Sequence, residues 1–249
     1  MSKVRFKIWR TPADSEGKFQ EYETEISEGM VVLDAVHQIQ AESANDLAVR
    51  WNCKAGKCGS CSAEINGHPK LMCMTRMSDL PSDQPVKIQP MKAFPVIKDL
   101  VTDVSINYRV KKSIKKFKPR PPDAPDGTWR MAQSDIDRVQ EFRKCIECFL
   151  CQDVCHVLRE HQLHEQFAGP RHMVYHASLE MHPLDVEDRT RDLKEKNGIG
   201  FCNITKCCTH VCPEHITITD NAIIPLKERV ADRFYDPLMK LFSIFSKQK

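Results

Sequence analysis

Twelve cysteines fall into three tight groups, and no other feature of this chain restricts its fold as strongly. The groups lie at residues 53–73, 145–155 and 202–212. Metal sites need such clustering, whereas disulfide frameworks rarely show it. Twelve cysteines among 249 residues is also below the density of a disulfide scaffold. We therefore expect a chain that folds around metal in a reducing compartment, where thiolates survive as ligands.

The first group has a long loop spacing, Cys-x4-Cys-x2-Cys, with a fourth cysteine further along. This spacing is typical of plant-type two-iron clusters, and a zinc site, the alternative, favours paired short modules instead. Gly56 and Gly59 suit such a loop because glycine reaches positive φ without strain. The predicted two-iron ligands are Cys53, Cys58, Cys61 and Cys73.

The second group, "CIECFLCQDVCH", cannot complete a four-iron site by itself. In bacterial-type runs the fourth cysteine precedes proline and ligates a different cluster from the first three. Here His156 follows the fourth cysteine, and the proline follows Cys212 in the third group instead. We therefore predict a four-iron cluster on Cys145, Cys148, Cys151 and Cys212.

The third site lacks one ligand for a second cube. Thr205 occupies the position three residues after Cys202, where a further thiolate would be needed. Adjacent cysteines cannot easily bind one cluster because consecutive side chains diverge, so Cys207 is left as a small buried thiol. We expect a three-iron cluster on Cys155, Cys202 and Cys208.

Hydrophobic periodicity separates a strand-rich part from a helical part. Alternation and an Asn66-Gly67 turn predict two hairpins in the first part. The proline-rich segment 118–127 can be neither helix nor strand interior, so we place domains at residues 1–115 and 116–249. Strands are expected at 4–8, 19–26, 62–71 and 86–91, and helices at 32–39, 95–114, 134–145, 171–181 and 221–234.

Charge and hydropathy limit the partners. A net charge of +3 gives no argument for nucleic acid as a partner. The start lacks the apolar segment of a signal peptide, and no stretch approaches the roughly 18 apolar residues of a spanning helix. Membrane contact is therefore expected to be peripheral or through partners.

The cysteine motifs resemble those of a known family. "WNCKAGKCGSCSAEING", "FPVIKDLVTDVSINYR", "CIECFLCQDVC" and "CCTHVCP" are similar to segments of the iron–sulfur subunits of succinate dehydrogenase and fumarate reductase, along almost the full chain. The resemblance implies an α+β fold, in which an N-terminal β-grasp plant-type ferredoxin domain precedes an all-helical bacterial-ferredoxin-like domain. It also implies the 2Fe-2S, 4Fe-4S and 3Fe-4S ligand sets given above.

The resemblance further implies a succinate dehydrogenase subunit. Such a chain relays single electrons from the FAD of a flavoprotein partner toward quinone, at the cytoplasmic face of the bacterial membrane, where anchor subunits hold it. It contains no complete active site and no catalytic residue of its own. Three alternatives stay open: a fumarate reductase subunit, the electron-transfer arm of another flavoprotein oxidoreductase, and a zinc-stapled interaction protein.

The sequence departs from the family at the quinone end. Many members have proline, tryptophan and histidine where this chain has His156, Glu160 and Asn203, so quinone contacts cannot be carried over. Six histidines between residues 156 and 182 are interpreted mainly as surface or packing residues; the alternatives are a proton donor to quinone and an extra metal site. The basic stretch 109–120 is interpreted as solvated or partner-docking, or as binding an anionic headgroup, and residues 236–247 as an amphipathic helix.

Overall fold

The computed structural model describes residues 2–11 and 16–237. Its contacts group the chain into two compact units. Unit 1 comprises Met1–Ser105, Ile146–Val154 and Val211–Glu214, and unit 2 comprises Ile106–Cys145, Cys155–His210 and His215–Lys249. These units are defined by contacts rather than by continuous sequence, so the domain boundary at residue 115 stays a prediction.

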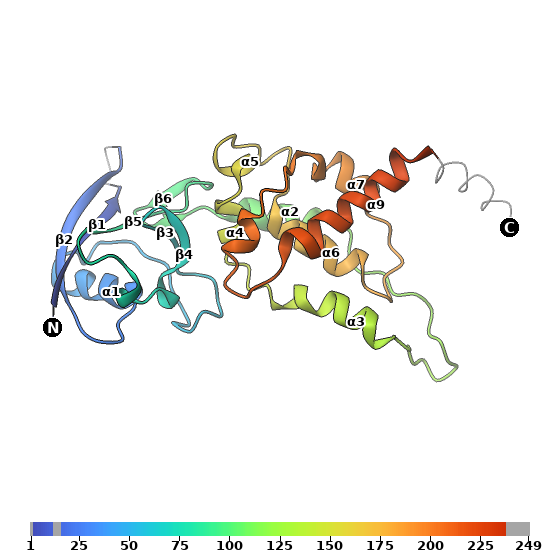
Figure 1. The fold of residues 1–249 in the computed structure, drawn as a ribbon, viewed down its shortest axis with the longest axis horizontal. Helices are drawn as coiled ribbons and strands as arrows, with labels where there is room; N and C mark the ends of the chain where they lie inside the picture. Colours follow the sequence, from blue (N-terminus) through green and yellow to red (C-terminus); the bar gives the residue numbers. More distant parts are fainter. Residues whose placement is uncertain (1, 12–15, 238–249) are drawn as a thin grey trace. The chain divides into compact units, whose positions relative to one another are not determined.

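Unit 1 is built on a five-stranded mixed sheet (Figure 1). The strand order is β2-β1-β5-β3-β4, and β1 runs parallel to β5 but antiparallel to β2. Phe6 and Ile8 point into the core from alternate positions of β1, as the period of two predicts. The bounds are β1 Ser2–Arg10, β2 Lys18–Ile26, β3 Ser62–Ile65, β4 His68–Leu71 and β5 Val86–Gln89.

One helix packs on this sheet. Helix α1, Val32–Glu42, buries Val32, Leu33, Val36 and Ile39 in the same hydrophobic core as the strands. These positions recur at helical spacing, so one face of α1 is apolar. The rest of unit 1 includes the short helices η1 Met72–Met74, η2 Met77–Asp79 and α4 Leu150–Asp153, and the strand pair β6 Val96–Lys98 and β7 Val101–Thr102.

The helix expected at residues 95–114 is wrong in its first half. A two-stranded ladder joins β6 and β7, and only Ser105–Ser113 is helical, as α2. Asp99 turns with a positive φ of 48° between the two strands, a backbone conformation that a right-handed helix does not contain. A short hairpin therefore precedes a shorter helix.

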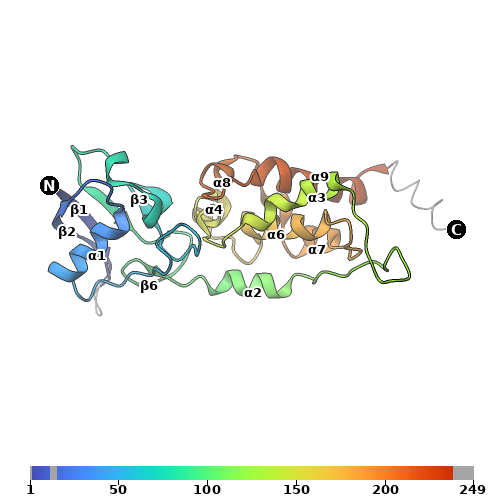
Figure 2. The ribbon, with the colours of Figure 1, turned by 90° about the horizontal axis from the view of Figure 1, so that it is seen from below.

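Unit 2 is helical (Figure 2). Figure 2 shows α6, α7 and α9 side by side, and His172 of α6 contacts the carbonyl of Asn107 on α2 at 2.9 Å. The predicted α+β class, with a strand-rich first part and a helical second part, is confirmed. The bounds are α3 Gln133–Gln140, η3 Glu141–Lys144, α5 His156–Arg159, α6 Pro170–Glu180, α7 Thr190–Glu195, η4 Ile199–Phe201, α8 Cys207–His210, the π-helix η5 Ile218–Ile223 and α9 Ile224–Phe234.

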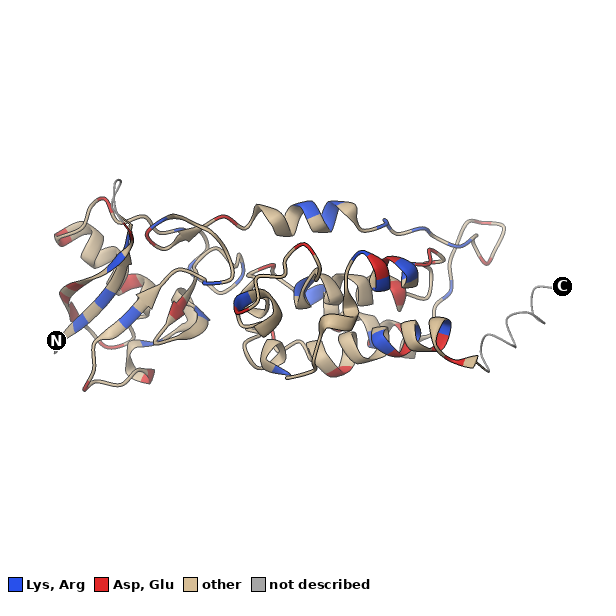
Figure 3. Cartoon of the chain, turned by 90° about the horizontal axis from the view of Figure 1, so that it is seen from above, with Lys and Arg blue, Asp and Glu red and all other residues tan. Residues whose placement is uncertain are grey.

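The lysine and arginine residues of the basic stretch 109–120 lie on α2 and on the segment after it, and they are blue in Figure 3. Its second half folds back against an acidic segment of the same unit. Lys115 Nζ forms ion pairs with Glu187 at 3.2 Å and with Asp192 at 3.5 Å. The main chain pairs as well, since Arg120 N donates to Leu184 O at 2.8 Å. These lysine and arginine contacts are internal and structural, which the charge run alone did not indicate.

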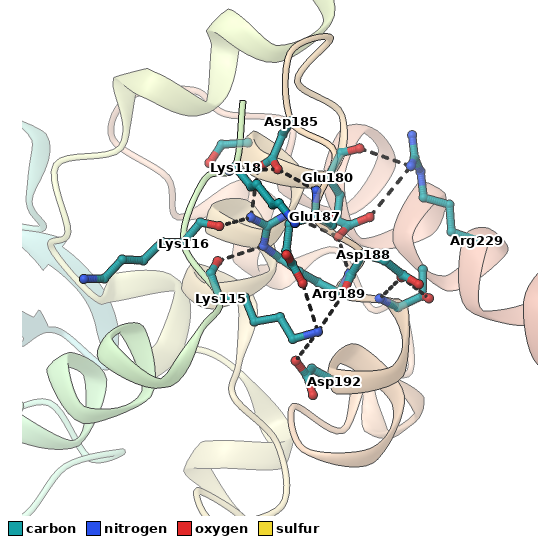
Figure 4. A network of polar contacts seen from close by, with 12 residues as sticks. Lys115, Lys116, Lys118, Glu180, Asp185, Glu187, Asp188, Arg189, Asp192 and Arg229 are labelled. Atoms are coloured by element: carbon teal, nitrogen blue, oxygen red, sulfur yellow. Dashed lines mark hydrogen bonds and ion pairs between the residues drawn. The ribbon is translucent and has the colours of Figure 1, made fainter. Parts of the chain in front are cut away.

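Arg189 is the centre of this arrangement (Figure 4). Its side chain is fully buried and donates to the carbonyls of Lys115 and Lys116 at 2.8 and 2.6 Å. The guanidinium also pairs with Asp185 at 2.9 Å and with Glu180 at 3.5 Å. A buried cation needs such partners, because desolvation is costly unless paired charges and hydrogen bonds offset it. Arg189 therefore ties residues 115–116 to α6 and to the segment that leads into α7.

Part of the chain lies outside this description. The expected apolar face of Leu238, Leu241, Phe242 and Phe245 falls in residues 238–249, outside the described residues. Within the described ranges, none of the helices has the length and the apolar character that crossing a bilayer requires.

Candidate iron–sulfur centres

The first cysteine loop turns its backbone toward its own sulfurs. Lys54, Gly56 and Gly59 have positive φ values of 54°, 67° and 68°, which curl the chain between strands. As a result, the amides of Ala55 and Lys57 lie 3.4 and 3.3 Å from Cys53 Sγ. Amides in this position stabilise the negative charge of thiolate sulfur, which is one way in which proteins adjust iron–sulfur clusters.

The four thiols of this loop interact with one another. Burial opposes ionisation of Cys58, but hydrogen bonds from Ser60 and from Cys53 outweigh it and lower the pKa of the Cys58 thiol to about 6. Burial raises the pKa of Cys61 to about 12, with further contributions from Cys73 and Cys58. The structure thus brings Cys53, Cys58, Cys61 and Cys73 within interaction range, and their assignment as cluster ligands stays a prediction.

The second cysteine segment packs on this loop within unit 1. A Cβ on Gly59 would stand 2.7 Å from the Cα of Cys148, so only glycine fits there. Ser62 Oγ donates to the Cys148 carbonyl at 2.8 Å, and Asp153 Oδ1 accepts from Ala93 N at 3.0 Å. Three independent contacts therefore hold residues 146–154 against the two-iron loop and its sheet.

Local backbone geometry orients the second cysteine group. Glu147 and Phe149 flank Cys148 with positive φ values of 56° and 61°, and Phe149 then begins α4. Cys148 and Cys151 are buried, and Cys212 lies partly buried in the third segment of unit 1. Cys145 directly precedes the second segment of unit 1, Ile146–Val154. The assignment of the four as ligands of one cluster stays a prediction.

The third group gathers inside unit 2. Burial, together with the neighbouring Cys207 and Cys202 sulfurs, raises the pKa of Cys155 to about 11, although hydrogen bonds from the Leu158 and Val157 amides oppose the rise. Burial likewise raises the pKa of Cys208 to about 11; the Thr219 hydroxyl opposes this rise, and Cys207 and Cys202 add to it. All four thiols are therefore close enough to interact, although Cys207 is partly exposed rather than buried as expected.

A cation and a hydroxyl also lie at the third group. Lys227 of α9 donates from Nζ to the Cys202 carbonyl at 2.5 Å. Thr205 Oγ1 lies 3.2 Å from Cys207 Sγ. Neither contact was predicted from the sequence. The first depends on how residues 202–208 pack against α9, and the second on the local turn of residues 205–207.

The donor set fits iron–sulfur clusters. Buried thiols with a raised pKa give up their protons only when a cation replaces them, as iron does on ligation. The amide donors toward Cys53 Sγ in the first loop suit the negative charge of a cluster-bound thiolate. Within residues 2–11 and 16–237, no three His, Cys, Asp or Glu side chains converge as a site for a single metal ion.

The three positions at which this chain departs from the family at the quinone end all lie on the surface. His156, Glu160 and Asn203 are exposed. The six histidines behave mostly as interpreted: His161 is exposed and His164 and His182 are partly buried. His172 and His176 are packing residues, which the interpretation includes: they lie inside unit 2 on α6, only 2% and 1% exposed.

Comparisons with known proteins agree with this geometry. Residues 5–108 match the family described as a 2Fe-2S iron-sulfur cluster binding domain, and residues 141–216 match the family described as a 4Fe-4S dicluster domain. A chain of the Mycobacterium smegmatis Sdh1 complex in the apo form superposes with a TM-score of 0.89 and 58% identity, covering 94% of this chain and 98% of that one.

Two curated relatives span similar lengths. The fumarate reductase iron-sulfur subunit of Mycobacterium tuberculosis is 33% identical, over 84% of this chain and 84% of the relative. The succinate dehydrogenase iron-sulfur subunit of Bacillus subtilis is 30% identical, over 87% of this chain and 88% of the relative.

Proposed function

Since this chain belongs to the family of iron–sulfur electron-transfer subunits of succinate dehydrogenase and fumarate reductase, we propose that it serves a succinate dehydrogenase. The observation that carries this choice is the 58% identity with a chain of the Sdh1 complex, over 94% of this sequence. In that role the chain would pass electrons from a partner's flavin toward quinone. Fumarate reductase is the second candidate, favoured by the Mycobacterium tuberculosis relative at 33% identity.

The family carries 2Fe-2S and 4Fe-4S clusters, and we assign ligands to them residue by residue. Cys53, Cys58, Cys61 and Cys73 would hold the two-iron cluster, and Cys145, Cys148, Cys151 and Cys212 the four-iron cluster. A three-iron cluster on Cys155, Cys202 and Cys208 is the finer part of the proposal. Sulfur interactions among Cys155, Cys202, Cys207 and Cys208 support a cluster at this group, and the burial of Cys155 and Cys208 favours them over Cys207.

The clusters, when bound, exchange single electrons and no groups. The chain's own residues position them and set their surroundings. Amides at Cys53 and the buried contacts at Cys148 do this in unit 1, while Thr219 and Lys227 do it in unit 2. In this proposal the flavin chemistry on succinate belongs to a partner subunit.

The partners in this proposal are a flavoprotein subunit that contains FAD, and membrane anchor subunits near quinone. The attachment would be peripheral, at the cytoplasmic face of the bacterial membrane. Exposed His156, Glu160 and Asn203 differ from the usual family residues, so the quinone end would use contacts of its own.

Purification of the native complex from membranes tests the proposal. The tagged chain is isolated in mild detergent, its partners are identified by mass spectrometry, and two rates are measured: succinate-driven quinone reduction and quinol-driven fumarate reduction. A flavoprotein partner and a faster succinate reaction are expected. A faster fumarate reaction would favour the second candidate, and a complex without flavin or iron would refute both.

A further inference from the structure

A chain of hydrogen bonds ends on one sulfur of the third cysteine group. Thr219 Oγ1 lies 3.5 Å from Cys208 Sγ, and both side chains are buried. Thr209 Oγ1 lies 3.1 Å from Thr219 Oγ1 and donates to it, while it accepts from the Thr219 amide at 3.0 Å. Two hydroxyls and one amide thus form a closed local circuit beside Cys208.

This circuit decides which atom donates at the sulfur. The Thr209 hydroxyl donates its hydrogen to Thr219 Oγ1, so the hydroxyl hydrogen of Thr219 is available for another acceptor. Cys208 as a metal ligand is a thiolate and can only accept. Thr219 therefore donates to Cys208 Sγ, and the bond from Thr209 polarises and strengthens it.

The backbone places Thr219 there by an uncommon route. Ile218–Ile223 forms a π-helix, a geometry that is rare and is found frequently at functional sites. Thr219 stands in its first turn with an exposed fraction of only 1%, where its amide would lack a helical partner. Thr209 supplies that partner, so the same two residues cap the π-helix and orient the hydroxyl.

We propose that Thr219 is a positioning residue: its hydroxyl, oriented by Thr209, donates a hydrogen bond to Cys208 Sγ and thereby raises the reduction potential of the cluster that Cys208 ligates. Reduction adds one electron and therefore negative charge to the sulfurs, and a hydrogen bond to sulfur stabilises that charge. The inference rests on the proposed function for the existence of this cluster, but not on its iron count or on the direction of the reaction.

The test uses the purified complex and a redox titration followed by EPR at low temperature. Thr219→Val keeps the shape of the side chain and removes the hydroxyl. We expect a tenfold shift of the one-electron equilibrium toward the oxidised cluster, equivalent to a potential lower by about 59 mV. Thr219→Ser retains the donor and should stay close to wild type.

Two further variants separate the inference from general perturbation. Thr209→Val removes the orienting partner and should lower the same potential, by less than Thr219→Val does. Thr205→Val removes a hydroxyl beside Cys207, which is not an assigned ligand, and should leave the potential unchanged.

The outcomes distinguish the two proposals. An unchanged potential in Thr219→Val, with the EPR signal intact, overturns the inference while the proposed function stands. An equal fall in Thr219→Ser also overturns it, because the hydroxyl would then not matter. A wild-type complex without any cluster at Cys208 would refute the ligand assignment instead, since Cys208→Ala would then change no EPR signal.

Discussion

The Cα of Cys148 lies 2.7 Å from the point where a Cβ on Gly59 would stand. Gly59 belongs to the two-iron loop and Cys148 to the second cysteine group, so two predicted centres share one close backbone contact. Side-chain carbons essentially never approach backbone that closely, and the backbone of a buried cysteine cannot yield as a flexible side chain can. Gly59 also has a φ of 68°, which disfavours any other residue.

Gly59→Ala should therefore displace residues 146–154 from the two-iron loop. We expect weaker EPR signals from both the two-iron and the four-iron clusters, and a denaturation midpoint well below wild type. The measurement is spin quantitation of the purified complex alongside thermal unfolding.

Gly67→Ala is the matched control. Gly67 has a similar φ of 80°, but nothing lies within 4 Å of its Cβ position. Its cost should be the backbone strain alone, about 1 kcal/mol, with both cluster signals intact. Equal effects of the two substitutions would show that the contact with Cys148 is unimportant.

Arg189→Met should destabilise unit 2 strongly. The change removes the cation between the buried carboxylates of Glu180 and Asp185, and it removes the side-chain donor to the carbonyls of Lys115 and Lys116. Removing one member of a buried ion pair costs about 3–5 kcal/mol. Denaturant unfolding followed by circular dichroism measures the loss.

Arg191→Met provides the comparison, because Arg191 lies two residues away and is exposed. Its effect should stay within about 0.5 kcal/mol, as surface changes usually do. Limited proteolysis should also cut the segment around residues 115–120 faster in Arg189→Met only. A stable Arg189→Met protein with a protected segment would contradict this account of the network.

His176 should make the protein sensitive to acid. Burial lowers the pKa of its imidazole from 6.5 to about 4; Asn197 and Asp192 oppose this fall, and Arg189 and His172 add to it. Between these two values the unfolded chain binds a proton that the folded chain does not. The contribution of His176 to the free energy of unfolding is therefore fully present above pH 6.5, and it falls by about 3 kcal/mol in total as the pH drops toward 4.

His176→Phe removes the titrating group and keeps a buried ring. Neither ring nitrogen of His176 makes a well-formed hydrogen bond, so the substitution removes little beyond the interaction with the Asn197 side chain. The variant should lose less stability than wild type between pH 6.5 and 4, as measured by thermal midpoints across that range. Parallel pH profiles for the two proteins would assign the acid sensitivity to other groups.

Cys207 and Cys208 should differ in their effect on the third cluster. Cys208 is buried and accepts from Thr219, whereas Cys207 is partly exposed and contacts Thr205. Wild type should contain about nine irons and ten sulfides per chain and show a three-iron EPR signal when oxidised. Cys207→Ala should keep this signal, and Cys208→Ala should lose it. Loss of the signal in Cys207→Ala, or ten irons without it, would show that the ligand assignment is wrong.

Local patterns determined the class of this fold and its chemistry. Alternation around Phe6 and Ile8, helical spacing in α1 and the Asn66-Gly67 turn each depend on residues a few positions apart, so the sequence predicts them directly. Cysteine spacing is equally local, because one loop must wrap one cluster. The fold class and the family were therefore predictable, and both are confirmed.

Tertiary structure alone decided the rest. Gly59 meets Cys148, Arg189 holds the carbonyls of Lys115 and Lys116, and Thr219 reaches Cys208, yet no periodicity connects the members of these pairs. The ion pairs of Lys115 were not predicted, although the stretch 109–120 is mostly exposed as interpreted, and the helix expected from residue 95 was wrong in its first half. The conformations of both segments depend on distant partners, and the free energy of a buried contact is set by what surrounds it rather than by its neighbours in the chain.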